Sequence, residues 1–171
     1  MVAVAPLPDA GDCRDSAGNL ERRVWALLDE LPDPEIPVIS LTDLGVIRHV
    51  RTLPQGVQIG VTPTYTGCPA TAMIRSSIID TLQAAGIAPV QVVDVLEPAW
   101  STDWITERGA TKLRRFGIAP PRRRSAPILP PACPQCQSTS TEQVSEFGST
   151  PCKSLHRCCE CLEPFEHFKC I

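Results

Sequence analysis

The stretch VTPTYTGCPATAMIRSSIIDTLQAAG, residues 61–86, runs from the end of an apolar strand, through a loop that carries one cysteine, into a helix. Residues 57–62, which overlap the start of this stretch, alternate between apolar and polar side chains, which is typical of a half-buried β-strand. Residues 69–86 repeat apolar side chains at helical spacing, with Pro69 suited to the first turn and Gly86 to the C-terminal end. The side chains expected on the buried face of this helix are Met73, Ile74, Ile78 and Leu82.

The segments on either side extend this pattern. Residues 20–31 predict an amphipathic helix with Asn19 as its N-cap, and the residues around 54–56 predict a hairpin. Residues 89–96 are rich in β-branched side chains and are expected to form a central strand. Residues 102–117 predict a last, weaker helix, whose inward side chains would be Ile105, Leu113 and Phe116. The order predicts an α+β fold, in which a small mixed sheet carries helices on one face.

Composition divides the 171 residues into four parts. Residues 1–18 show no periodicity and are expected to form a disordered tail, whereas residues 19–117 hold the α+β domain. Residues 118–131 are rich in proline and contain three arginines, which predicts a stiff linker. Seven of the nine cysteines follow residue 132, so residues 132–171 are expected to form a small domain built on cysteine.

Charge and hydropathy exclude several classes of partner. The net charge of −3 gives no general attraction to nucleic acid or to anionic lipid. No apolar run approaches the roughly 20 residues that span a bilayer, and the N-terminal residues lack the basic segment of a signal peptide. We therefore expect a cytoplasmic protein that binds neither nucleic acid nor membrane.

Two C-x-x-C pairs in the C-terminal part have the spacing of a tetrahedral metal site. Each pair can place two thiolates on one tight turn, and a hairpin between the pairs can bring the turns together. A module of about 40 residues buries too little core to fold alone, so the bound metal would supply its stability. The expected ligands are Cys133, Cys136, Cys158 and Cys161.

The metal and one ligand remain open at this point. Zinc suits the ribbon-like spacing best, but four thiolates also bind a single iron or an iron–sulfur cluster. Cys159 could replace its neighbour Cys158, although Cys158 keeps the two-residue spacing to Cys161. Cys152 and Cys170 either support the metal site or belong to the core of the module.

Cys68 stands apart from this group. It precedes Pro69 where a helix N-cap would lie, and the exposed N–H groups of a helix N-terminus favour an ionised thiol. The alternative is a small buried side chain that only packs. Three carboxylates, of Asp33, Glu35 and Asp43, lie in irregular chain and are candidates for metal ligands, partner contacts or helix caps.

These motifs resemble known families. DPEIPVISLTDLGVI (33–47) and VTPTYTGCPA (61–70) resemble the iron–sulfur cluster assembly domain of the SufT and Mip-eighteen type. EPAWSTDWITERGATKLRRFGIAPP (97–121), together with the cysteine-rich residues 133–171, is similar to the PaaD (also called PaaJ) family, whose members are encoded with the bacterial phenylacetyl-CoA oxygenase, or epoxidase.

The resemblance implies an accessory protein without catalytic residues of its own. Such a protein would assist delivery of iron or an iron–sulfur cluster to the oxygenase and reductase components, which would be its partners. The alternative is a structural or electron-transfer subunit of the same complex. Zinc would occupy the four-cysteine site, iron or a cluster would be held transiently, and a homodimer is a further expectation. The transfer site implied by the family motifs consists of Cys68, Asp33, Glu35, Asp43 and Thr66.

Overall fold

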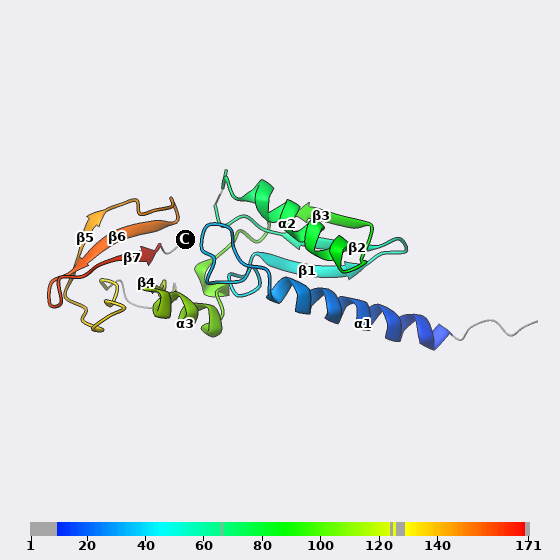
Figure 1. The fold of residues 1–171 in the computed structure, drawn as a ribbon, viewed down its shortest axis with the longest axis horizontal. Helices are drawn as coiled ribbons and strands as arrows, with labels where there is room; N and C mark the ends of the chain where they lie inside the picture. The colour runs from blue at the N-terminus through cyan, green and yellow to red at the C-terminus, as the bar shows by residue number, and fades with distance from the viewer. Residues whose placement is uncertain (1–9, 66, 124, 126–128, 170–171) are drawn as a thin grey trace, which may run out of the picture.

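The computed structural model describes residues 10–65, 67–123, 125 and 129–169. Two sheets lie end to end along the long axis of the molecule (Figure 1). One has the strand order β1-β2-β3 and the other β4-β7-β6-β5. The fold is therefore the predicted α+β domain followed by a small cysteine-bearing sheet.

The first sheet is built from β1 (Ile47–Thr52), β2 (Val57–Val61) and β3 (Val90–Asp94). β1 and β2 form the predicted antiparallel hairpin, and β3 pairs parallel to β2. The expectation of a central strand at residues 89–96 is wrong, because β2 occupies the centre and β3 the edge. The physical reason is the crossover: α2 returns the chain to the free side of β2, while the hairpin already fills its other side.

Two helices cover one face of this sheet. α1 (Ala10–Asp29) contacts β1, α2 (Thr71–Ala84) contacts β3, and the two helices contact each other. Leu28 of α1 and Leu82 of α2 are fully buried between helix and sheet. A buried leucine contributes about 1.5–3 kcal/mol, so these stripes supply much of the stability of the domain.

The ends of these helices differ from the predictions. α1 begins at Ala10, so the predicted tail is helical over residues 10–18 and Asn19 is not its N-cap. Proline is missing from the sequence between Pro8 and Pro32, and interior glycines cost a helix only about 1 kcal/mol each. α2 begins at Thr71, two residues after Pro69. Met73 is 59% exposed because the buried stripe of α2 follows Ile74 at intervals of four residues.

The helix predicted over residues 102–117 is two elements. A short 3-10 turn, η1 (Thr102–Trp104), precedes α3 (Glu107–Phe116). The Thr106 side chain caps α3 by accepting a hydrogen bond from the Gly109 N–H, which fixes the break. Gly117 ends α3 with a φ of 92°, as its position predicted, but Phe116 is 59% exposed rather than inward.

The second sheet begins inside the predicted linker. It contains β4 (Ile118–Ala119), β5 (Thr141–Ser145), β6 (Lys153–Cys158) and β7 (Pro164–Phe168). β4 pairs parallel to β7, and both of its residues are buried. Residues 118–119 are therefore part of the ribbon sheet, and the linker prediction for them is wrong. The turn at Gly117 places Ile118 and Ala119 beside β7 of the ribbon.

The ribbon packs firmly against the first domain. Phe168 of β7 and Cys152, just before β6, belong to the same buried cluster as the first sheet. The rings of Phe168 and Trp100 lie 6.0 Å apart, and the Trp100 indole N–H donates to the Leu44 carbonyl at 3.0 Å. Trp100 is therefore a core residue at the junction of the two sheets.

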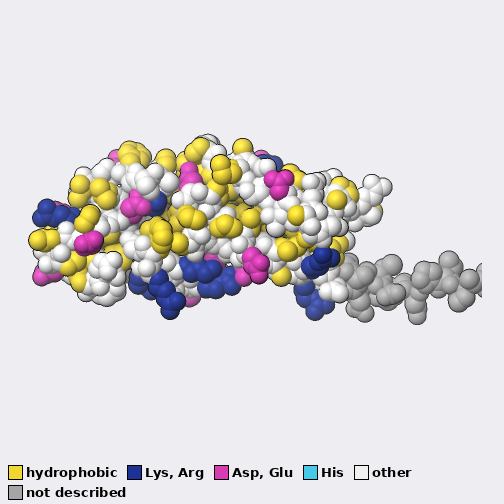
Figure 2. All heavy atoms as spheres, viewed as in Figure 1, with side chains coloured by type: hydrophobic (Ala, Val, Ile, Leu, Met, Phe, Trp, Pro, Cys, Tyr) yellow, Lys and Arg dark blue, Asp and Glu magenta, His cyan; other side chains and the backbone are white. Residues whose placement is uncertain are grey.

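Basic side chains gather on the surface of α3. Figure 2 shows lysine and arginine gathered over α3, on the lower side of the molecule. The charged residues of this helix include Arg108, Lys112, Arg114 and Arg115.

Within the described part of the chain, no helix has the length and apolar character needed to cross a membrane.

Candidate functional site

The structure gathers four cysteines at the far end of the ribbon. The sulfurs of Cys133, Cys136, Cys158 and Cys161 all lie within 4.8 Å of one another. The Cys133 and Cys161 sulfurs are 3.7 Å apart, and those of Cys136 and Cys158 are 3.5 Å apart. Zinc–sulfur bonds of about 2.3 Å in a tetrahedron require sulfur separations of about 3.8 Å. The four thiols therefore fit one tetrahedral metal ion.

The two cysteine turns have the same construction. The Cys133 N–H donates to the Ser138 carbonyl, and the Cys158 N–H donates to the Glu163 carbonyl, five residues ahead in each case. Each turn also contains a non-glycine residue with positive φ, at 65° for Gln137 and 62° for Leu162.

This correspondence makes Cys158 the counterpart of Cys133 and favours it over Cys159 as the ligand. Cys159 is exposed and lies outside the cluster. The backbone N–H of Cys161 donates to the Cys158 sulfur and lowers the pKa of that thiol to about 7, which prepares it as a thiolate ligand.

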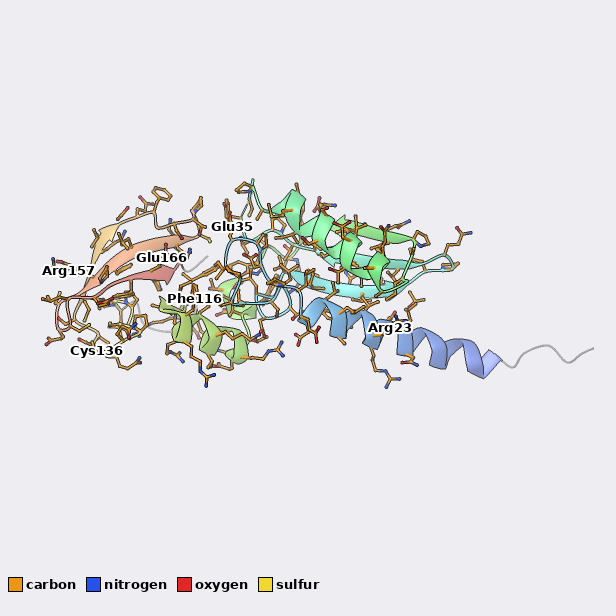
Figure 3. All side chains as sticks on the ribbon, in the orientation of Figure 1. Arg23, Glu35, Phe116, Cys136, Arg157 and Glu166 are labelled. Carbon is orange, nitrogen blue, oxygen red and sulfur yellow. The ribbon has the colours of Figure 1, made fainter. Side chains whose placement is uncertain are left out.

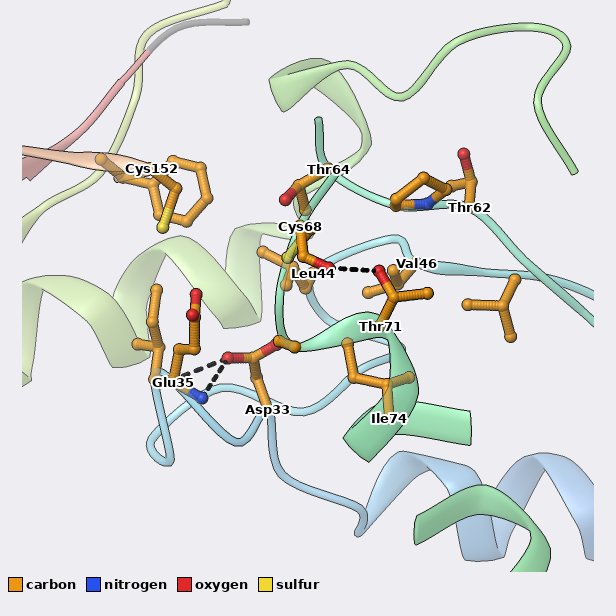
Figure 4. Close-up of a pocket in the computed structure, with 15 residues that line it drawn as sticks. Asp33, Glu35, Leu44, Val46, Thr62, Thr64, Cys68, Thr71, Ile74 and Cys152 are labelled. Carbon is orange, nitrogen blue, oxygen red and sulfur yellow. Dashed lines mark hydrogen bonds between the residues drawn. The ribbon is translucent and has the colours of Figure 1, made fainter. Parts of the chain in front are cut away.

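A second group of functional side chains surrounds a cavity where the two domains meet. Cys68 lines this cavity with Asp33 and Glu35, so three of the predicted residues come together there (Figure 4). Cys68 is partly buried and packs against the core of the first domain.

Cys68 is not the N-cap of α2, because Ala70 holds that position. Its carbonyl instead accepts from the backbone N–H and the hydroxyl of Thr71, at 3.2 and 2.9 Å. The Tyr65 hydroxyl lies beside the thiol. Burial, and the negative charge that Cys68 can carry, raise the pKa of Tyr65 to about 12.

Asp33 is held at the floor of this cavity by its own loop. The residue is only 5% exposed, and Oδ1 accepts backbone hydrogen bonds from Glu35 at 2.9 Å and Ile36 at 2.8 Å. Burial raises the pKa of Asp33 in spite of these bonds. Burial and the nearby Asp33 charge raise the pKa of Glu35 as well. Both carboxylates would therefore be stabilised by a neighbouring cation.

Cys152 completes the lining of the cavity from the ribbon side, and sequence reasoning did not assign it to this site. The residue is 5% exposed, its sulfur lies 3.0 Å from the Thr150 hydroxyl, and burial raises the pKa of the thiol. Cys152 has no C-x-x-C partner, and only the docking of the ribbon brings it to the cavity of Cys68. No pattern in the sequence could have indicated this approach.

Asp43 lies in a different environment and does not line the cavity, although its neighbour Leu44 does. It is fully buried and accepts hydrogen bonds from Thr106, Arg108 and Lys112 at 2.6, 2.8 and 2.8 Å. Burial favours the neutral acid, but these donors outweigh it and lower the pKa of Asp43 to about 2. Gly109 permits this arrangement, because an added Cβ would lie 3.0 Å from the Asp43 carbonyl oxygen. Asp43 thus connects α3 to the loop that contains Asp43. Thr66, the remaining predicted residue, lies outside the described residues.

The two sites occupy opposite ends of the ribbon. Figure 3 shows Cys136 at the outer end of the ribbon and Glu35 at the junction of the domains. β6 connects them, since Cys152 immediately precedes this strand and Cys158 ends it. A six-residue strand is about 20 Å long, so the metal cluster and the cavity are separate centres.

Fold and site together define a class of protein, an α+β domain that carries a ribbon with a four-cysteine cluster. Residues 21–95 match the family described as "Iron-sulfur cluster assembly protein", and residues 119–169 match "PaaD zinc beta ribbon domain".

A curated protein of Escherichia coli (strain K12), described as the D component of a "Putative 1,2-phenylacetyl-CoA epoxidase", is 52% identical over 151 residues, which cover 86% of this chain and 92% of that protein. The chain belongs to this family of phenylacetyl-CoA epoxidase subunits, the PaaD family.

The fold of the first domain also has a solved counterpart. The crystal structure titled "Domain of Unknown Function DUF59" from Bacillus anthracis is similar with a TM-score of 0.54 and 24% identity, covering 58% of this chain and 96% of that one. The likeness concerns the fold alone.

Proposed function

We propose that this protein is an accessory factor that delivers iron, or an iron–sulfur cluster, to the oxygenase and reductase components of a phenylacetyl-CoA epoxidase. The observation that carries the proposal is the cavity shared by Cys68, Asp33 and Glu35, in a domain that matches the iron–sulfur assembly family. A thiol beside one buried and one partly buried carboxylate is suited to holding a metal cargo that must later be released.

The four-cysteine cluster has a different task in this proposal. Cys133, Cys136, Cys158 and Cys161 hold zinc, which supplies folding energy to the ribbon. Zinc has no redox chemistry, so the ribbon serves to position chain and partner rather than to transfer electrons. The relative from Escherichia coli is described as an epoxidase subunit, which supports the oxygenase and reductase components as partners.

The chain performs no substrate turnover in this account, and the epoxidation belongs to its partners. Among the described cysteines none forms a disulfide, which supports a reducing compartment, the cytoplasm. Asp43 is left out of the transfer site, because Arg108 and Lys112 already neutralise it. A homodimer that brings two Cys68 thiols together stays a prediction, tested by the mass of the native protein in solution.

The test is the metal content of the reductase component in a strain that lacks this protein. We expect the isolated reductase to have lost iron and acid-labile sulfide, and to regain both when the wild-type chain, but not Cys68→Ala, is supplied. Cys159→Ala is the matched control, since Cys159 is exposed and lies outside both sites. A fully loaded reductase in the deletion strain would reject delivery. The protein would then be a structural subunit of the complex, or an electron-transfer subunit if the four-cysteine site holds iron.

A further inference from the structure

Two thiols from different domains line one cavity. Cys68 enters from the loop before α2, and Cys152 enters from the ribbon; Asp33 and Glu35 line the same cavity and lie below both cysteines in the view of Figure 4. The cavity has a volume of about 20 Å³. A space of roughly 10–15 Å³ holds one water, so there is room for a single small occupant and not for a cluster of several atoms.

One carboxylate oxygen at this cavity receives no hydrogen bond from the residues that the structure describes. The Oδ1 atom of Asp33 accepts two backbone hydrogen bonds, but within the described residues its Oδ2 atom accepts none. The residue is more than nine-tenths buried and lines the cavity. Oδ2 is not among the fully buried side-chain atoms that lack a partner, so it is accessible from the cavity and is free to coordinate a cation there.

The neighbouring ammonium group does not fill this role. Lys153 follows Cys152 directly, and its Nζ atom donates to Glu166 at 2.7 Å and to Ser149 at 2.6 Å. The lysine is therefore engaged on the ribbon, and the cavity presents two thiols and two carboxylates to whatever enters it. Sulfur and oxygen donors in one set suit a divalent first-row transition metal, because thiolates and carboxylates both bind such ions.

We propose that Cys68, Cys152 and Asp33 bind one divalent transition-metal ion between the two domains, with Glu35 as a fourth donor. This inference rests on the proposed function and deepens it, since it makes the cargo a single ferrous ion rather than a preassembled cluster. Binding releases one proton from each thiol that becomes a thiolate, and no electron is transferred. The ribbon thereby contributes a ligand to the site of the other domain.

Before the ion binds, the donor atoms of this site are not yet at ligand spacing. Within the described part of the chain, only the four ribbon cysteines form a group already gathered at ligand spacing. The cavity side chains must rotate toward the ion, and this reorganisation lowers the affinity. A site that is weaker than the four-cysteine cluster suits a cargo that is passed on, whereas the ribbon metal stays in place.

The test is a titration of the full chain, with zinc bound by the four ribbon cysteines, with cobalt(II) in the absence of oxygen. The absorption of thiolate–cobalt charge transfer reports binding through sulfur, and zinc content is measured in the same samples. We expect one cobalt per wild-type chain, and an affinity at least about tenfold weaker in Cys152→Ser and in Asp33→Asn, because even supporting residues of a metal site contribute that much. Cys159→Ser, whose thiol is exposed, is the control and should bind as the wild type does.

Zinc at one per chain in every variant shows that the ribbon is still folded. Cobalt bound by Cys152→Ser with wild-type affinity and absorption would overturn the proposal and make Cys152 a packing residue. Cys152→Ala repeats the measurement without the serine hydroxyl. The outcome is independent of the strain experiment: cobalt binding through both thiols, together with a fully loaded reductase in the deletion strain, would retain the site and reject the delivery function.

Discussion

The two sulfur-bearing centres of this molecule are built in opposite ways. The four ribbon cysteines come from two turns of identical construction, and the sulfurs already lie at metal-binding distances. The cavity at Cys68 draws its donors from the first domain and from the ribbon, and they are not yet gathered around one point. In our proposal, this difference separates a metal that holds the protein together from an ion that the protein can give away.

The largest effect is expected at the four-cysteine cluster. Cys158→Ser removes one ligand, and the structural metal of such modules contributes about 10–16 kcal/mol, so the ribbon should unfold. We expect zinc to fall from one per chain to near zero by elemental analysis, with loss of the ribbon signals in an NMR spectrum.

Cys159→Ser is the matched control for this change. The neighbouring thiol is exposed and outside the cluster, so its replacement should leave zinc and ribbon intact. If Cys159→Ser lost its zinc and Cys158→Ser kept it, the equivalence of the two turns would be contradicted.

The next effect tests whether the domains form one folded unit. Phe168 is 1% exposed and lies in the core of the first domain, so Phe168→Ala should lower the free energy of unfolding by about 3–5 kcal/mol. Denaturant unfolding measures this change. Phe147→Ala removes an equally large but 59% exposed ring and should change stability by less than about 1 kcal/mol. Similar losses for both would mean that the ribbon does not dock as described.

The sequence predicted the local features of both centres but not their assembly. The C-x-x-C spacing indicated the four cysteines that the ribbon brings together, because the chemistry of each turn lies within a few residues. The alternation in β2 and the stripe in α2 indicated the sheet and helix for the same reason. Cys152 could not be assigned, because its approach to the cavity of Cys68 depends on how two domains dock.

Asp43 shows what a sequence motif alone does not predict. Its sequence motif placed it with Asp33 and Glu35, although its contacts are with residues of the α3 region more than sixty positions away. The partners that decide the role of a carboxylate are chosen by tertiary packing. The start of α1 and the edge position of β3 were mispredicted for related reasons, since neither depends on the pattern of the segment alone.

A smaller effect on the free energy of unfolding is expected at Asp43, which does not line the cavity. The pKa of Asp43 is about 2 in the folded protein against 3.8 ordinarily, so the fold prefers the ionised form. This stabilisation is complete above about pH 4 and is lost as the pH falls toward 2, and the shift corresponds to about 2 kcal/mol. Asp43→Asn should therefore lower stability at neutral pH by about that amount and flatten the pH dependence between about pH 4 and 2, measured by denaturant unfolding.

Asp33→Asn is the counterpart of that change. Asparagine keeps the oxygen that accepts the two backbone hydrogen bonds, so stability should change by less than about 1 kcal/mol while metal binding weakens. Weaker cobalt binding in Asp43→Asn than in Asp33→Asn would return Asp43 to the site.

The central claim is that one chain holds a fixed metal in the ribbon and an exchangeable ion at Cys68. Zinc, iron and acid-labile sulfide should be measured in wild-type and Cys68→Ala proteins purified without oxygen. The account predicts about one zinc per chain in both proteins, and iron without sulfide in the wild type alone. Iron that persists in Cys68→Ala, or a wild-type chain that takes up zinc but no iron when ferrous ion is supplied, would contradict it.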